Sequence, residues 1–178
     1  MLVGRDGAGA HDLRRMAELG RVYWSAAASQ WYAEPKRLTK LGYLSARTQP
    51  GRTHDRTHYE LTDKARAALA DWVRTPTSLP RIQQESVVRL LGADLVDPAA
   101  VLEGLQPLRA ELEAALGDAA VARERIPAFE HRAHLLDVNN RYAQRFLELQ
   151  LEWLDEAERV LRARGTPPAE HGDARRAL

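Results

Sequence analysis

Cysteine is absent from this 178-residue chain, and its absence excludes several kinds of chemistry at once. Without thiols there is no disulfide bond, no zinc or iron–sulfur site held by cysteine, and no cysteine nucleophile. Long apolar runs are also missing: none approaches the roughly 18 residues that cross a bilayer, and the first ten residues lack the apolar segment of a secretory signal. We therefore expect a cytoplasmic protein that does not associate with membranes.

Motifs of enzymatic sites are missing as well. There is no nucleophile elbow of the G-x-S-x-G type, no P-loop and no dinucleotide fingerprint. The nearest approach to a metal site is Glu130, His131, His134 and Asp137, within two turns of a predicted helix. Polar residues on the exposed side of a long helix are the commoner explanation. We expect no enzymatic activity, no metal and no cofactor.

Charge is distributed unevenly along the chain. The net charge of +1 divides into +5 over residues 1–78 and −4 over residues 79–178. An imbalance of five charges over 78 residues is modest and can arise by chance. It gains weight because the cations gather on a predicted hairpin and on the helix before it. The first half of the chain is therefore suited to a polyanion, and the second half is not.

Residues 25–73 have the pattern helix, strand, basic turn, strand, helix, and a short helix precedes them. Apolar residues follow helical spacing in the helices and cluster in both strands. Gly42 marks a helix end, and Pro50 with Gly51 marks the turn between the strands. The expected elements lie at about 11–19, 27–41, 43–49, 56–61 and 63–73. A helix that enters a groove, followed by a hairpin with a cationic tip, predicts a winged helix-turn-helix that binds DNA.

The candidate DNA contacts are polar and cationic side chains away from the apolar stripe. Guanidinium groups match phosphate oxygens bidentately, and hydroxyl and amide groups reach base edges or phosphates. The candidates are Ser29, Gln30, Tyr32, Lys36, Arg37 and Lys40 on the helix, and Arg52, His54, Arg56 and His58 on the hairpin. The alternative is a solvated helix face and a solvated turn, with Tyr32 packed against the protein.

The second half is predicted to be helical. Pro76 and Pro80 bracket a polar segment, so we place an interdomain linker at 76–81. Helices are expected at about 82–91, 98–125 and 128–164, with a kink or break near Gln106 because Pro107 lies inside the second one. The predicted organisation is a disordered N-terminus at 1–10, a DNA-binding domain at 11–75, a helical dimerisation domain at 82–164 and a disordered tail at 165–178.

The last predicted helix carries two apolar stripes. One consists of Leu135, Val138, Tyr142, Phe146, Leu149, Trp153 and Val160. The other consists of Leu136, Ala143, Leu147, Leu151, Leu154 and Leu161. A helix with one solvent-exposed side needs one stripe, so two stripes predict burial on two sides, the second against a partner subunit. We assign the partner contact to the second stripe. One broad core face is the alternative.

Four segments resemble the PadR family of transcriptional regulators over roughly residues 11–164. They are SQWYAEPKRLTKLGYL, GRTHDRTHYELT, DKARAALADWV and RYAQRFLELQLEWLDEAERVL. The residues that match the family pattern are Tyr32, Leu38 and Gly42 on the recognition helix and its exit, and Arg52, Arg56 and Tyr59 on the wing. The resemblance implies a mainly α fold with a small β-hairpin wing. It also implies a homodimeric repressor that binds an inverted repeat in double-stranded DNA, often released by a small aromatic or amphipathic effector.

The chain departs from the family pattern in two places. The family has a helix before the one expected at 11–19, and no counterpart is recognisable here. Pro35 stands where the family usually has an apolar helix former, and proline inside a helix costs roughly 3 kcal/mol. We expect Pro35 to kink the recognition helix or to shorten its N-terminal part. Both departures favour an alternative function: a winged-helix dimer that has lost DNA binding and serves protein interaction or ligand sensing.

Overall fold

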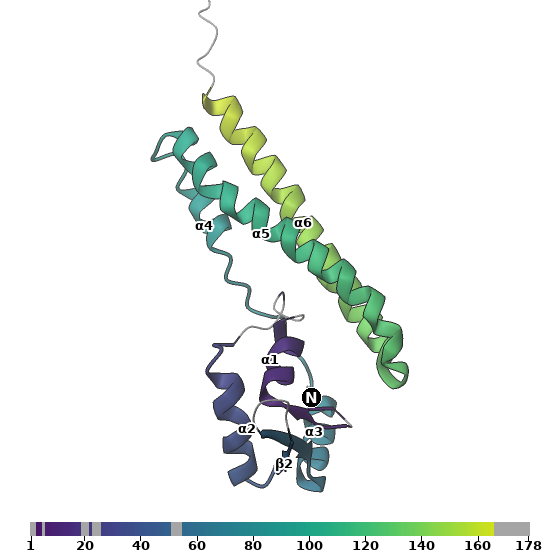
Figure 1. Cartoon of the computed structure of the whole chain (residues 1–178). Coiled ribbons are helices and arrows are strands. Elements are labelled where there is room, and N and C mark those ends of the chain that lie inside the picture. The colour runs from purple at the N-terminus through teal and green to yellow at the C-terminus, as the bar shows by residue number, and fades with distance from the viewer. Residues whose placement is uncertain (1–2, 5, 19–21, 23–25, 51–54, 166–178) are drawn as a thin grey trace, which may run out of the picture. The chain divides into compact units, whose positions relative to one another are not determined.

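The computed structural model describes residues 3–4, 6–18, 22, 26–50 and 55–165 (Figure 1). The chain divides into two compact units, Met1–Pro80 and Arg81–Leu178. The boundary falls inside the segment 76–81 that we expected to be a linker. The prediction of a mainly helical protein with a small antiparallel sheet is confirmed. None of the described helices is long and apolar enough to cross a membrane.

The described residues of the first unit form three helices and a three-stranded antiparallel sheet. Its elements are β1 (Ala8–Gly9), α1 (Ala10–Glu18), α2 (Gln30–Lys40), β2 (Leu44–Gln49), β3 (Arg56–Leu61) and α3 (Asp63–Arg74). The strand order is β1-β3-β2. The predicted hairpin corresponds to β2 and β3, whereas β1 was not predicted. A two-residue strand shows no alternation, and only its pairing with β3, which sets Ala8 opposite Tyr59, defines it.

The core of the first unit includes the N-terminal segment. Val3 and Ala8 are buried together with Leu13, Leu44 and Tyr59. The expectation of disorder at 1–10 is therefore wrong for the described part of that segment. Its glycine content suggested disorder, but Gly4 and Gly7 adopt positive φ angles of 64° and 76°, which glycine tolerates without strain. The glycines shape this segment so that it packs on the sheet.

Pro35 does not interrupt α2. It is buried, and the helix continues on both sides of it. Proline has no backbone N–H and so removes one donor from the helix. The Pro35 carbonyl, by contrast, accepts a 2.8 Å hydrogen bond from the Thr39 hydroxyl. The helix begins at Gln30, about three residues later than expected.

Contacts at the C-terminal end of α2 hold it against the start of α3. Gly42 has a φ of 76°, where an L side chain would be strained, so the chain can leave the helix sharply. The Thr62 hydroxyl donates to the Gly42 carbonyl at 2.8 Å and accepts from the Ala65 amide at 3.3 Å, which caps α3. Lys64 donates to the Leu41 carbonyl at 2.8 Å and lies over the Tyr43 ring. These contacts fix the position of α2 relative to the hairpin.

The second unit is built on two long helices. Its elements are α4 (Glu85–Leu91), α5 (Pro98–Arg125), two short 3-10 turns η1 (Ile126–Ala128) and η2 (Glu130–Arg132), and α6 (Ala133–Gly165). Figure 1 shows α5 and α6 running side by side, and the short connection makes them antiparallel. Pro107 lies within α5 without interrupting it, so the break considered near Gln106 does not occur. The tail predicted at 165–178 lies outside the described residues except for Gly165, the last residue of α6.

The buried stripe of α6 is the one that we assigned to a partner subunit. Leu154 and Leu161 are 0% and 1% exposed within the single chain, and Ala143 and Leu147 are also buried. Leu136 and Leu151 are half-buried. The other stripe is the exposed one, with Leu135, Val138, Tyr142, Leu149 and Val160 each at least 45% exposed. The assignment is corrected accordingly: the chain itself, chiefly α5, covers the second stripe. Sequence periodicity shows that both stripes are apolar but not which neighbour covers each.

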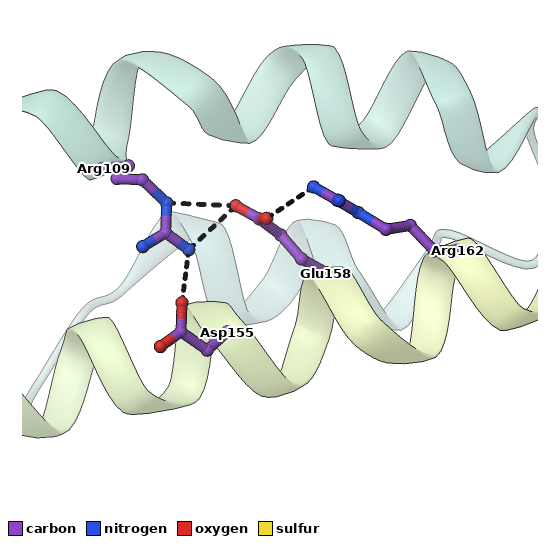
Figure 2. Close-up of polar contacts among 4 residues, drawn as sticks. All are labelled: Arg109, Asp155, Glu158 and Arg162. Carbon is purple, nitrogen blue, oxygen red and sulfur yellow. Dashed lines mark hydrogen bonds and ion pairs between the residues drawn. The ribbon is translucent and has the colours of Figure 1, made fainter.

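An ionic cluster joins α5 to α6 (Figure 2). Arg109 Nη2 lies 2.6 Å from Asp155 Oδ1 and 3.0 Å from Glu158 Oε1, and Arg162 Nη2 lies 2.8 Å from Glu158 Oε2. Hydrogen bonds first to Asp155 and then to Glu158 raise the pKa of Arg109. Glu158 is only 9% exposed, so both of its oxygens need these partners. The cluster therefore sets how α5 and α6 align.

Candidate nucleic-acid interface

The exposed face of α2 carries three cations. Each residue of a helix is rotated by about 100° from the last, which separates the buried Pro35 from Lys36, Arg37 and Lys40. All six candidates on this helix and at its start, Ser29, Gln30, Tyr32, Lys36, Arg37 and Lys40, are exposed. Tyr32 is 43% exposed, so its ring packs in part while the rest meets solvent. A positive helix face of this kind can meet phosphates and base edges.

One carboxylate lies among these cations. Arg37 Nε donates to Glu34 Oε2 at 2.9 Å and to Oε1 at 3.2 Å, and Arg37 Nη2 lies 2.9 Å from Oε2. The hydrogen bond to Glu34, and then its charge, raise the pKa of Arg37. Glu34 is the only acidic residue of α2. The helix therefore offers a net positive surface on which one arginine is already engaged.

The outer face of the sheet adds further cations. Cross-strand register sets Arg47 opposite His58 and Gln49 opposite Arg56, on the face away from Leu44 and the core. Arg56 is exposed at the start of β3. Arg47 is exposed and forms an ion pair with Glu60. Sequence reasoning missed Arg47, although strand alternation around the buried Leu44 and Tyr59 contained the signal.

His58 has a different environment from the one expected of a DNA contact. Its Nε2 lies 3.1 Å from the Asp6 carbonyl oxygen and 4.0 Å from Glu60 Oε1. Its side chain is only 20% exposed. In this structure His58 anchors the N-terminal segment to β3, because the β1–β3 pairing brings residues 52 positions apart together. Arg52 and His54, the other two hairpin candidates, lie outside the described residues.

No group of three or more histidine, cysteine, aspartate or glutamate side chains in the described part of the chain is arranged to hold a metal ion. Asp137, one of the four residues weighed as ligands, instead pairs with Arg123 at 3.5 Å and Arg141 at 3.3 Å. The cationic surface of the first unit is therefore the strongest candidate for a functional site.

Comparison with known proteins finds a family model and a curated relative that each match part of this chain. Residues 82–162 match the family model described as virulence activator alpha C-term. The negative transcriptional regulator PadR of Bacillus subtilis (strain 168) is 39% identical over 64 residues. That match spans 35% of this chain and 35% of the relative. The resemblance to the PadR family is confirmed.

Solved structures of PadR and of a PadR-like regulator share the fold of most of this chain. Bacillus subtilis PadR in complex with operator DNA superposes with a TM-score of 0.68 at 21% identity, covering 87% of this chain and 91% of that one. The same protein in complex with p-coumaric acid gives a TM-score of 0.63 at 22% identity, covering 88% and 91%. A PadR-like regulator from Bacillus cereus gives 0.73 at 14% identity, covering 87% and 88%. The PadR-like architecture thus spans both units.

Proposed function

We propose that this PadR-like chain is a DNA-binding transcriptional regulator that reads double-stranded DNA with α2 and contacts phosphates with the β2–β3 hairpin. The observation that carries the proposal is the exposed face of α2, where Lys36, Arg37 and Lys40 lie opposite the buried side of the helix. Cations on one face of a positioned helix supply phosphate contacts, and neighbouring polar groups reach base edges. The likeness to a negative regulator supports repression as its action.

The proposed regulator is a homodimer that pairs through the exposed stripe of α6. Leu135, Val138, Tyr142, Leu149 and Val160 form a row of large apolar side chains at helical spacing, each at least 45% exposed. Tyr142 stacks on Phe146 with ring centroids 6.2 Å apart, which adds a flat aromatic surface. Apolar rows of this length on a soluble chain mark an interaction surface. A second copy offers a row of identical chemistry.

Charge on α6 favours an antiparallel arrangement of the two copies. The first part of the exposed stripe is flanked by Arg141 and Arg145. The second part is flanked by Glu148, Glu152 and Glu156. A two-fold axis near the middle of α6 brings the arginines of one copy toward the glutamates of the other. Two-fold symmetry also supplies two copies of α2, which matches an inverted-repeat operator.

An effector site is proposed between α4 and α6. An open pocket of about 270 Å³ there is lined by Leu90 of α4, by Ala93 of the turn that follows α4, and by Trp153, Val160 and Arg164 of α6, among others. Apolar walls and an indole suit an aromatic ring, and a guanidinium at the edge suits a carboxylate. The chemistry fits a small aromatic or amphipathic acid, and p-coumaric acid, bound by Bacillus subtilis PadR, is the first compound to test.

DNA binding is tested by the salt dependence of affinity for the full-length protein. Lys36→Gln with Lys40→Gln should weaken binding to every duplex and lower the slope of log affinity against log salt by about two. Arg66→Gln with Arg74→Gln changes the net charge equally on α3 and serves as the control. An equal decrease of the salt slope in both double variants would show that α2 does not contact DNA. A wild-type protein that binds no duplex at low salt would favour the alternative, an interaction or ligand-sensing module.

A further inference from the structure

The exposed face of α2 contains an ion pair between Glu34 and Arg37. Glu34 and Arg37 are three residues apart and share a side of the helix. Both carboxylate oxygens lie within 3.2 Å of Arg37 Nε. Other exposed intrahelical pairs, such as Arg66 with Asp63 on α3 and Arg89 with Glu85 on α4, lie outside α2. The Glu34–Arg37 pair alone lies on α2, the helix proposed to read DNA.

The pair leaves part of the guanidinium available. Arg37 uses Nε and Nη2 toward Glu34, so the edge formed by Nη1 and Nη2 keeps donors that point elsewhere. Arginine reads guanine, or grips a phosphate, through two parallel N–H groups on one edge. Glu34 therefore restricts the orientation of Arg37 while leaving one recognition edge free of the carboxylate.

The same carboxylate lowers the attraction of α2 for the DNA backbone. Without Glu34 the helix would carry three uncompensated cations, and with it the net charge falls to +2. Phosphate contacts supply essentially all of the affinity for non-specific DNA, whereas base contacts distinguish sequences. A residue that weakens phosphate contacts and orients a base contact therefore changes the ratio of specific to non-specific affinity.

We propose that Glu34 is a specificity-determining residue, which acts through Arg37 by orienting its guanidinium for a base contact and by suppressing its attraction to phosphates of unmatched DNA. The inference rests on the proposed DNA-binding function. It assigns to an acidic residue on a basic face a role that net charge alone does not suggest.

The experiment compares full-length wild type, Glu34→Gln, Arg37→Met and the double variant on two duplexes. One duplex is selected from a random pool by the wild-type protein, and the other is a scrambled duplex of the same base composition. Glu85→Gln is the matched control, because it removes one charge and one exposed intrahelical pair from α4. Fluorescence anisotropy from 50 to 200 mM salt yields affinity and salt slope for each pair.

Glu34→Gln should bind the scrambled duplex more tightly than wild type, with a salt slope larger by about one. That extra contact corresponds to an additional fall in affinity of about 3.5-fold between 50 and 200 mM salt. Affinity for the selected duplex should gain less, so the ratio of specific to non-specific affinity should fall. In the Arg37→Met background the same substitution should leave the ratio unchanged, and Glu85→Gln should match wild type throughout.

A ratio that stays constant or rises in Glu34→Gln would overturn the inference. So would an effect of equal size in the Arg37→Met background, because Glu34 would then act on phosphates directly. Failure of the proposed function would give a different result. The wild-type protein itself would then bind neither the starting pool nor the scrambled duplex.

Discussion

Leu154 lies on the buried face of α6 and Leu149 on the exposed face, and truncating each to alanine should affect a different property. Leu154 is 0% exposed within the single chain, packed in the core of the second unit. Leucine and alanine are both strong helix formers, so Leu154→Ala changes packing rather than helix propensity. Truncating a buried leucine costs about 2–5 kcal/mol. The free energy of unfolding should fall by that amount.

Leu149 is 59% exposed in the single chain, so most of its surface is available to the partner subunit proposed above. Burying a whole leucine side chain is worth about 1.5–3 kcal/mol, and the exposed share amounts to roughly 1–2 kcal/mol in each copy. A symmetric interface loses the contact twice, or roughly 2–3.5 kcal/mol in all. The dimer dissociation constant of Leu149→Ala should rise roughly 20- to 400-fold.

Two measurements separate the effects. Sedimentation equilibrium over a range of concentrations yields the dissociation constant, and urea unfolding followed by helical circular dichroism yields stability. Unfolding must be repeated at several protein concentrations, because dimerisation itself stabilises the folded chain. A Leu154→Ala protein that dissociates without losing stability, or a Leu149→Ala protein that dimerises like wild type, would refute the assignment of the two faces.

Three further predictions follow from single contacts. Gly7→Ala should lower stability by about 1–2 kcal/mol in thermal unfolding, because φ is 76° and the added Cβ would lie 2.3 Å from a ring nitrogen of His58; an unchanged melting temperature would contradict this. Arg109→Met should cost about 1–3 kcal/mol by leaving Glu158 short of a partner, and adding Glu158→Leu should recover part of it in urea unfolding. Because the pKa of Arg109 is raised, its contribution is fully present below the unfolded pKa and constant between about pH 6 and pH 9. Arg56→Ala should lower the salt slope of DNA binding by about one, while His58→Ala should not; equal slopes would contradict the placement of His58.

Local patterns in the sequence predicted most of the secondary structure. The bounds expected for α5, Pro98 to Arg125, are those observed, because Asp97 and Pro98 form a strong helix start. Gly42 marked the end of α2 in the same way. Each of these signals acts within a few residues, which makes it readable without knowledge of the fold.

Non-local pairing escaped prediction. Strand β1 exists because Ala8 and Gly9 pair with residues about 50 positions later, and no local pattern in two residues encodes that contact. The same pairing brings His58 to the Asp6 carbonyl and away from the role expected for a cationic hairpin. The glycine content suggested a disordered N-terminus, because composition does not show which distant residues the segment pairs with.

The two stripes of α6 show which features the sequence predicts and which depend on the tertiary structure. Apolar residues at helical spacing determined that this helix carries two apolar stripes. Which face meets α5 depends on how the turn after Arg125 orients α6, and on the ion pairs that Arg109 makes with Asp155 and Glu158. Hydrophobic burial is non-directional, so both stripes are equally suited to either neighbour until that geometry is set. The sequence alone determined that α6 has two apolar stripes, and only the tertiary structure decided that Leu154 belongs to the core and that Leu149 is exposed.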